Sequence, residues 1–198
     1  MIQQDLLIAW GATFRKYQKD QTIFFEGDKA LFYYEVTEGS VKMVNINEEG
    51  KEFIQGFFKR GESFGEPVLL IDEQYPACAV ANEDCVIIRI SRQDFIQLLK
   101  EYPDIHLTFT QVLSKRLYNK SVMSKEISSY GPEHRITTLL QILKKNYGIL
   151  NCCPKFKIDF SRQQIADMTG LRVETVIRCM KKMEEKSLLS IEKGKVFF

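Results

Sequence analysis

Short apolar and aromatic runs recur between about residues 22 and 90. Turn signals that contain Gly, Glu, Asp or Asn separate these runs. Short strands at this spacing predict an antiparallel sandwich or barrel. The stretch before residue 22 is predicted to form a short helix that leads into the sheet. The predicted strands are 22–25, 32–36, 41–46, 53–58 and 86–90.

The pattern then changes to that of one long helix, from about Pro103 to Ser129. Apolar residues recur there at steps of three and four, and no Pro or Gly interrupts the run. A helix of about 25 residues is roughly 37 Å long, which is too long for one small barrel to cover. We therefore expect its stripe to pair with the same helix of a second chain; the alternative is a core helix packed only on its own domain. The predicted interface residues are Phe109, Val112, Leu113, Leu117, Met123 and Ile127.

A break follows the long helix, and a third section begins after it. Tyr130-Gly131-Pro132 has the composition of a hinge. A helix is predicted over about residues 135–147, and a linker that contains Cys152-Cys153-Pro154 follows. The chain therefore divides into segments 1–102, 103–130 and 131–198.

The segment after this linker has the pattern of a helix-turn-helix. Ser161 with Gln164 three residues later predicts a capping box at the start of the first helix. Ala166 is small where two helices would cross, and Gly170 suits the left-handed backbone that ends the first helix. Val176 is apolar where the second helix must pack back on the first. Small, glycine and apolar residues at these offsets predict the motif.

The second helix of such a motif enters a DNA major groove with its N-terminal residues at the base edges. Glu174 and Arg178 are four residues apart and share one face. Arg can bind guanine O6 and N7 together, and Glu can accept from cytosine N4. We predict base contacts from both residues and from Val173. The alternative is that Glu174 only favours a helix N-terminus and pairs with Arg178 on the surface. The residues predicted to contact phosphates are Arg162, Arg172, Thr175, Lys181, Lys182, Lys193 and Lys195.

The chain end and the charge distribution agree with this prediction. Residues 188–191 and 195–198, joined by Glu192-Lys193-Gly194, predict a two-stranded wing. Residues 1–130 contain 15 Lys/Arg against 19 Asp/Glu, a net of −4, whereas residues 131–198 contain 13 against 7, a net of +6. This asymmetry indicates that only the C-terminal third meets a polyanion.

Composition excludes several other classes of protein. With 44% hydrophobic and 27% charged residues, the 198-residue chain is typical of soluble globular proteins. It has no signal-peptide pattern and no apolar run of about 20 residues, so we expect a cytoplasmic protein with no membrane partner. The five cysteines are scattered and contain no CxxC pair, which argues against a disulfide framework or a zinc ribbon.

The chain offers little material for catalysis. Its two histidines, His106 and His134, both follow the predicted strands, so no metal cluster of the cupin enzymes is expected. No set of nucleophile, base and orienting group is evident. We therefore predict no enzyme, no metal and no cofactor. Haem ligation by His106 and a redox pair of Cys152 and Cys153 are less favoured alternatives.

Order and motifs together resemble the Crp/Fnr family of bacterial transcription regulators, over essentially the whole chain. The stretches 61–66, 90–95 and 170–178 carry the resemblance. It implies an α+β fold with an N-terminal double-stranded β-helix, a cupin-like jelly roll similar to cyclic-nucleotide-binding domains, over 1–102. A long dimerisation helix and a C-terminal winged helix-turn-helix are implied for the other two segments. It also implies a homodimer that binds an inverted-repeat DNA site and contacts RNA polymerase.

The recognition helix is more similar to the Fnr branch of this family. Val173-Glu174-Thr175 followed by Arg178 matches that branch, which usually carries Ser just before the Arg, whereas Ile177 stands there in this chain. A second hypothesis is a small-molecule-binding module that acts on protein partners and keeps a vestigial helix-turn-helix.

The same resemblance argues against known effectors of the family. In cyclic-AMP-binding members a Gly-Glu pair holds the ribose and a later Arg-Ser pair binds the phosphate. Here Tyr75-Pro76 replaces the second pair, Pro lacks an amide donor and Tyr lacks a guanidinium, so we expect no cyclic AMP binding and a turn role for Gly65-Glu66. No Cys precedes Cys78, which excludes the N-terminal iron–sulfur sensor. The effector is unknown; the pocket residues that the resemblance implies are Gly65, Glu66, Tyr75, Lys120 and Ser121.

Overall fold

The computed structural model describes residues 2–147 and 156–198. It contains two compact units, Met1–Ser114 and Lys115–Phe198, which we describe separately. The division between them falls inside one long helix rather than at its ends. The predicted domain boundaries after residues 102 and 130 do not coincide with this division and stay predictions.

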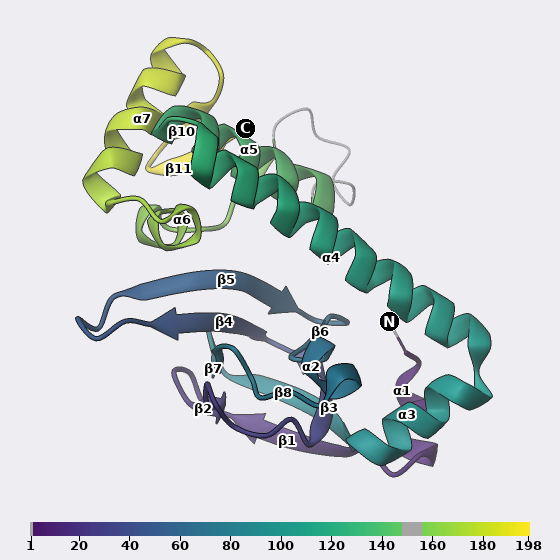
Figure 1. Cartoon of the computed structure of the whole chain (residues 1–198). Helices are drawn as coiled ribbons and strands as arrows, with labels where there is room; N and C mark the ends of the chain where they lie inside the picture. Colours follow the sequence, from purple (N-terminus) through teal and green to yellow (C-terminus); the bar gives the residue numbers. More distant parts are fainter. Residues whose placement is uncertain (1, 148–155) are drawn as a thin grey trace. The chain divides into compact units, whose positions relative to one another are not determined.

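Two four-stranded antiparallel sheets make up most of the first unit (Figure 1). Their strand orders are β1-β8-β3-β6 and β2-β7-β4-β5. This arrangement confirms the predicted barrel of short strands. The strands are β1 (Thr13–Tyr17), β2 (Thr22–Phe24), β3 (Phe32–Glu38), β4 (Ser40–Ile46), β5 (Glu52–Lys59), β6 (Ser63–Phe64), β7 (Cys78–Ala81) and β8 (Cys85–Ser91).

Three short helices complete the first unit: α1 (Gln4–Ala9), α2 (Pro67–Ile71) and α3 (Arg92–Glu101). The predicted helix before residue 22 is present as α1, but strand β1 follows it and was missed. Strands β6 and β7 and helices α2 and α3 were missed as well. Most of β1 is exposed, so its side chains lack the apolar alternation that identifies a strand.

Aromatic rings pack on both faces of the first sheet because neighbouring residues of a strand point to opposite faces. Tyr34 lies on one face, with its ring centroid 5.4 Å from that of Phe64 and 5.6 Å from that of Phe24. Tyr33 lies on the other face and stacks on Phe95 of α3, with centroids 4.2 Å apart. The rings on the first face form a cluster that we call the roll interior: Phe24, Tyr34, Phe64 and Tyr75.

Helix α4 spans Pro103–Ser129 as predicted, but its apolar stripe is used differently. Phe109 is only 1% exposed, and its ring packs edge-on against Tyr33 and Phe95. Leu113 packs on the same core. Since Phe109 is already buried in its own chain, its assignment to a dimer interface is wrong.

Another side of α4 carries exposed apolar side chains. Leu107, Leu117 and Tyr118 are 58%, 67% and 65% exposed, and we call these three residues the α4 outer face. Leu107 and Tyr118 are eleven residues apart, about three helical turns, so they share one side of the helix, and Leu117 lies beside them. Of the predicted interface residues, Leu117 alone belongs to this face. The half-buried ones are Val112, Leu113, Met123 and Ile127.

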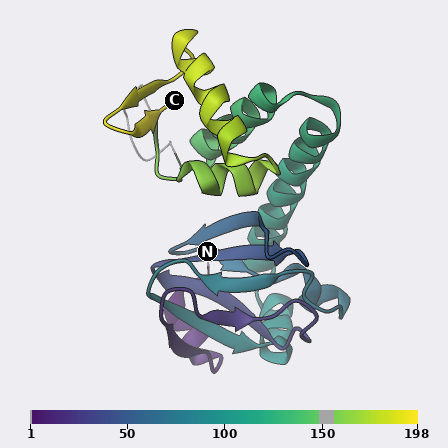
Figure 2. The same cartoon turned by 90° about the vertical axis from the view of Figure 1, so that its left-hand side faces the viewer.

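The described residues of the second unit form three further helices and a small sheet (Figure 2). The predicted wing is confirmed by two paired strands; the first begins two residues later and ends one residue later than predicted, and the second ends one residue earlier. A third strand, which was missed, joins them in the order β10-β11-β9. The linker cysteines Cys152 and Cys153 lie outside the described residues. The elements are α5 (Pro132–Tyr147), β9 (Lys157–Ile158), α6 (Arg162–Thr169), α7 (Val173–Glu185), β10 (Ser190–Glu192) and β11 (Lys195–Phe197).

No helix in these two described stretches combines the length and the apolar character that crossing a membrane requires.

Candidate DNA-binding surface and effector site

Local sequence determines both ends of α6. The Oγ of Ser161 accepts from the backbone N–H of Gln164 at 3.1 Å, and the Oε1 of Gln164 accepts from the backbone N–H of Ser161 at 2.9 Å. This confirms the capping box. Gly170 ends the helix with φ of 67°, the left-handed conformation that was predicted for it. The N–H of Leu171 then donates to the carbonyl of Ala166 at 3.0 Å, which closes the turn.

Helix α7 packs back on α6 through one side only. Ala166 of α6 and Val176 of α7 are both 0% exposed, as the motif requires. The other buried residues of α7 are Cys179, Met180 and Met183. These positions follow steps of three and four, so the opposite side of the helix is left to solvent.

The solvent side of α7 presents Glu174 and Arg178 together. Both side chains are exposed. Within the described part of the chain, neither forms an ion pair or a hydrogen bond. The alternative of a surface pair between them therefore has no support in the structure. Both groups keep their full capacity for a ligand, and Val173 is half-buried at the first position of the helix.

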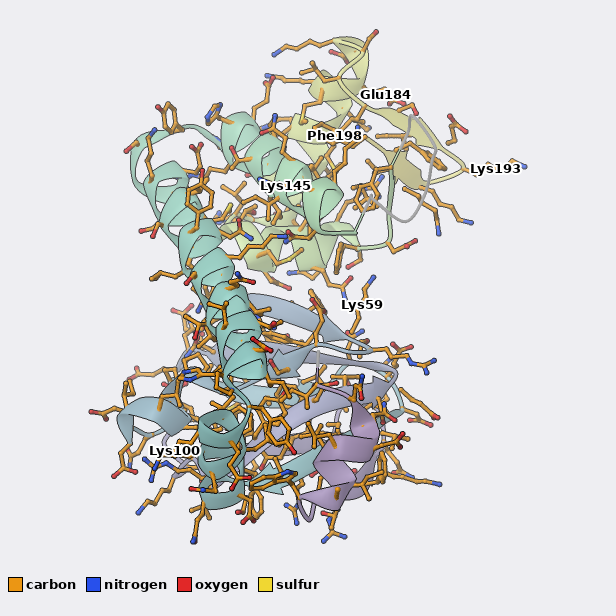
Figure 3. All side chains as sticks on the ribbon, turned by 90° about the vertical axis from the view of Figure 1, so that its right-hand side faces the viewer. Lys59, Lys100, Lys145, Glu184, Lys193 and Phe198 are labelled. Carbon is orange, nitrogen blue, oxygen red and sulfur yellow. The ribbon has the colours of Figure 1, made fainter. Side chains whose placement is uncertain are left out.

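The residues predicted to contact phosphates are distributed over α6, α7 and the wing. Arg172 is exposed at the N-cap of the helix, while Thr175 is half-buried. Lys193 lies in the wing turn with φ of 50° and projects from the wing tip (Figure 3). The Oε1 of Glu184 accepts from the N–H of Ile191 at 2.8 Å and so ties the end of α7 to the wing. Exposed cations that complete the set are Lys181, Lys182 and Lys195, and Arg162 is half-buried.

Sequence reasoning assigned no contact to Ile177. Its side chain is 42% exposed and lies on the same side of α7 as Glu174 and Arg178. In the sequence, Ile177 stood out only as the residue that replaces the usual Ser directly before Arg178.

The implied effector residues of the first unit are built into its core. Gly65 has φ of 71°, and a Cβ added there would lie 2.9 Å from the Phe24 ring and 3.0 Å from the Tyr75 ring. Glu66 is 0% exposed and its Oε1 accepts from the hydroxyl of Ser63 at 2.8 Å. Gly65 thus serves the backbone turn and the packing of two rings, in agreement with the turn role predicted for it.

Tyr75 fills the position at which the resemblance implied a phosphate-binding arginine. Its ring stacks on Phe24 with centroids 3.6 Å apart, and its hydroxyl donates to the carbonyl of Phe32 at 3.4 Å. Tyr75 is 2% exposed, and burial raises its pKa, as burial also raises the pKa of Tyr34 to about 12. The roll interior is therefore a packed aromatic core of neutral side chains.

Lys120 and Ser121, the other implied effector residues, lie on α4 in the second unit. The hydroxyl of Ser121 donates to the carbonyl of Leu117 at 3.0 Å, an ordinary contact for a helical serine. Partial desolvation and the neighbouring charge of Arg116 lower the pKa of Lys120. Both residues are exposed, unlike Tyr75 and Glu66.

Comparison with known proteins covers both units. A model of the cyclic nucleotide-binding domain matches residues 14–102, and a model of the Crp-like helix-turn-helix domain matches residues 134–197. The cAMP-activated global transcriptional regulator CRP of Pasteurella multocida is 32% identical over 88% of this chain and 84% of its own length. The global nitrogen regulator of a Nostoc species is 29% identical over 91% and 82%.

Solved structures give the same result. The c-di-GMP responsive global regulator CLP of Xanthomonas campestris superimposes with a TM-score of 0.77 at 25% identity, over 97% of both chains. A CooA mutant from Carboxydothermus hydrogenoformans superimposes with a TM-score of 0.83 over 98% of this chain and 85% of its own. At 18% identity, the second likeness concerns the fold alone.

Proposed function

The chain belongs to the Crp/Fnr family of transcription regulators, and from this premise we propose that it acts as a homodimer that reads an inverted-repeat DNA site through α7. Its two matched domains are a cyclic-nucleotide-binding-type sensor domain and a helix-turn-helix DNA-binding domain. The relatives that it matches are transcription regulators rather than enzymes.

One observation carries the proposal about base reading. Glu174 and Arg178 are exposed on the side of α7 that faces away from its buried contacts with the rest of the unit, and neither is engaged by a described residue. Guanine O6 and N7 suit the two parallel donors of Arg178, and cytosine N4 suits the carboxylate of Glu174. The arrangement also favours DNA over a protein partner for this unit, because cations flank the exposed face on both α7 and the wing.

Binding to DNA sites selected from a random pool tests this role. We expect Arg178→Ala to lose about 1–3 kcal/mol on the selected site and to relax the preference at one guanine. The matched control is Lys193→Ala, which should weaken selected and random DNA alike and reduce the salt dependence. An Arg178→Ala variant that weakens both DNAs equally would contradict base reading by Arg178.

The α4 outer face is the surface that we propose for dimerisation. Leu107, Leu117 and Tyr118 expose large apolar side chains on one helix, and a two-fold axis along α4 would bury each against its copy. An inverted repeat follows from the dimer symmetry, and we expect half-sites about one helical turn apart, roughly 34 Å, as is usual for dimeric helix-turn-helix proteins.

Leu117→Glu tests this interface. A charge at a desolvated apolar contact should give monomers in sedimentation and abolish specific DNA binding while the fold remains intact. Leu113→Glu is the contrasting variant, because Leu113 packs on the core of the first unit and its loss should lower the stability of that unit instead. A wild-type chain that sediments as a monomer at micromolar concentration would refute the proposal.

We further propose that the DNA-bound dimer works in the cytoplasm and contacts RNA polymerase there. The support is the matched transcription regulators. Transcription in a purified system, from a promoter that carries the selected site, tests it. The expected result is a change in transcript yield that depends on the site, and an unchanged yield would count against the contact.

A further inference from the structure

The solvent side of α7 carries one large apolar side chain among its polar ones. Ile177 lies three residues after Glu174 and directly before Arg178, so all three project from the same side of the helix. Its 42% exposure leaves much of an apolar side chain in water in the free protein. Burying such surface is favourable, so a ligand that covers this side gains from an apolar group placed opposite Ile177.

Core packing does not account for this position. The side of α7 that packs on the rest of the unit is formed by Val176, Met180 and Met183, each at most 1% exposed. A branched apolar residue is also not needed to hold the helix there, because polar long-chain residues have equal or better helix propensity. The exposed part of the Ile177 side chain is therefore available to whatever covers the solvent side of α7.

The major groove of DNA offers one apolar group at its base edges, the C5 methyl of thymine. We propose that Ile177 selects a thymine by contacting this methyl group, at a base pair beside the one that Arg178 reads. This inference rests on the proposed DNA-binding function and adds a specificity-determining residue to it. Discrimination would come from burial of the methyl group and of the Ile177 side chain, with no hydrogen bond involved.

Replacement of thymine by uracil isolates this contact, because dU lacks only the C5 methyl and keeps the same base pairing. A preferred site is first selected with the wild-type protein, and each thymine of that site is then replaced singly by dU. We expect one thymine per half-site at which dU lowers the affinity about fourfold, the factor that corresponds to about 0.8 kcal/mol for one buried methyl-sized group. Symmetric replacement in both half-sites should lower the affinity about sixteenfold.

The variant Ile177→Ala should bind the thymine and uracil sites equally, because its side chain ends at Cβ. Alanine favours the helix, so the variant is expected to fold. The matched control is Leu188→Ala, which removes a 49% exposed apolar side chain beyond the end of α7 and should keep the wild-type response to dU.

Two results would overturn the proposal while specific binding persists. One is a wild-type protein that no dU replacement weakens. The other is a loss on dU replacement that is the same in Ile177→Ala as in the wild type. A wild-type protein that selects no preferred site at all would overturn the proposed DNA-reading function as well, so the two failures are distinguishable.

Discussion

The buried core of the first unit and the solvent side of α7 both contain residues that the sequence singled out for ligands, and these residues are engaged in the first region and exposed in the second. In the first unit, Tyr75 stacks on Phe24 and Glu66 accepts from Ser63, so folding itself occupies both side chains. In the second unit, Glu174 and Arg178 are exposed and engage no described residue. This difference shows how to recognise a candidate binding residue: its side chain stays exposed after folding, and its charge and hydrogen-bonding groups are not used by the rest of the chain.

Two glycines allow the sharpest test of this contrast, because both have the same backbone conformation in different surroundings. Gly65 has φ of 71° and rings at 2.9–3.0 Å from an added Cβ, whereas Gly170 has φ of 67° and no described atom within 4 Å. We expect Gly170→Ala to cost about 1–2 kcal/mol of stability, the cost of a left-handed residue that has a Cβ. Gly65→Ala should cost about 2–5 kcal/mol, because overpacking of about 1–3 kcal/mol is added.

Calorimetric unfolding measures the loss of stability in both glycine variants, once each unfolding transition has been assigned to one of the two units. Gly65→Ala should lower the transition of the first unit and Gly170→Ala that of the second. Equal losses in the two variants would mean that the Phe24 and Tyr75 rings yield to the added methyl group. The roll interior would then be loosely packed.

Cyclic nucleotides provide the next test. We expect neither cyclic AMP nor cyclic GMP to bind at micromolar concentration, because Tyr75 supplies no guanidinium and Pro76 no amide donor. Each charged hydrogen bond is worth about 1.5–3 kcal/mol, so loss of a bidentate pair costs a hundredfold or more in affinity. Titration calorimetry with both nucleotides decides the matter, and a micromolar dissociation constant for either would show that the roll interior opens to a ligand.

The DNA-binding motif could be predicted in detail because each of its signals is local. The side chain of Ser161 caps helix α6 by accepting from a backbone N–H only three residues later, and Gly170 ends that helix through its own left-handed φ. The burial of Val176 follows from the periodicity of its own helix. The same locality gave the bounds of α4, which no Pro or Gly interrupts.

Residues whose surroundings come from distant segments could not be placed this way. Phe109 was predicted at a dimer interface, but its partners Tyr33 and Phe95 come from β3 and α3, and helical periodicity does not say which neighbour an apolar stripe will meet. Strand β1 was missed for a similar reason. Its hydrogen bonds to β8 bring together residues more than sixty positions apart, and its mostly exposed side chains leave no alternating apolar pattern.

A buried acid of the first unit gives the smallest expected effect and extends the contrast to pH. Glu35 is 2% exposed, and burial raises its pKa, although the hydroxyl of Tyr33 donates to its Oε2 at 2.8 Å and opposes the rise. The folded chain therefore holds this proton to higher pH than the unfolded chain, whose carboxyl titrates near 4.5. Between these two pKa values the folded state binds more protons, so the stability of the first unit should fall as pH rises through that window.

Glu35→Gln should flatten this slope and raise stability above the window, and Tyr33→Phe, which removes the opposing hydrogen bond, should steepen it. Unfolding of both variants across the acid range measures the slopes, and a Glu35→Gln slope equal to that of the wild type would show that Glu35 carries its charge in the fold without cost.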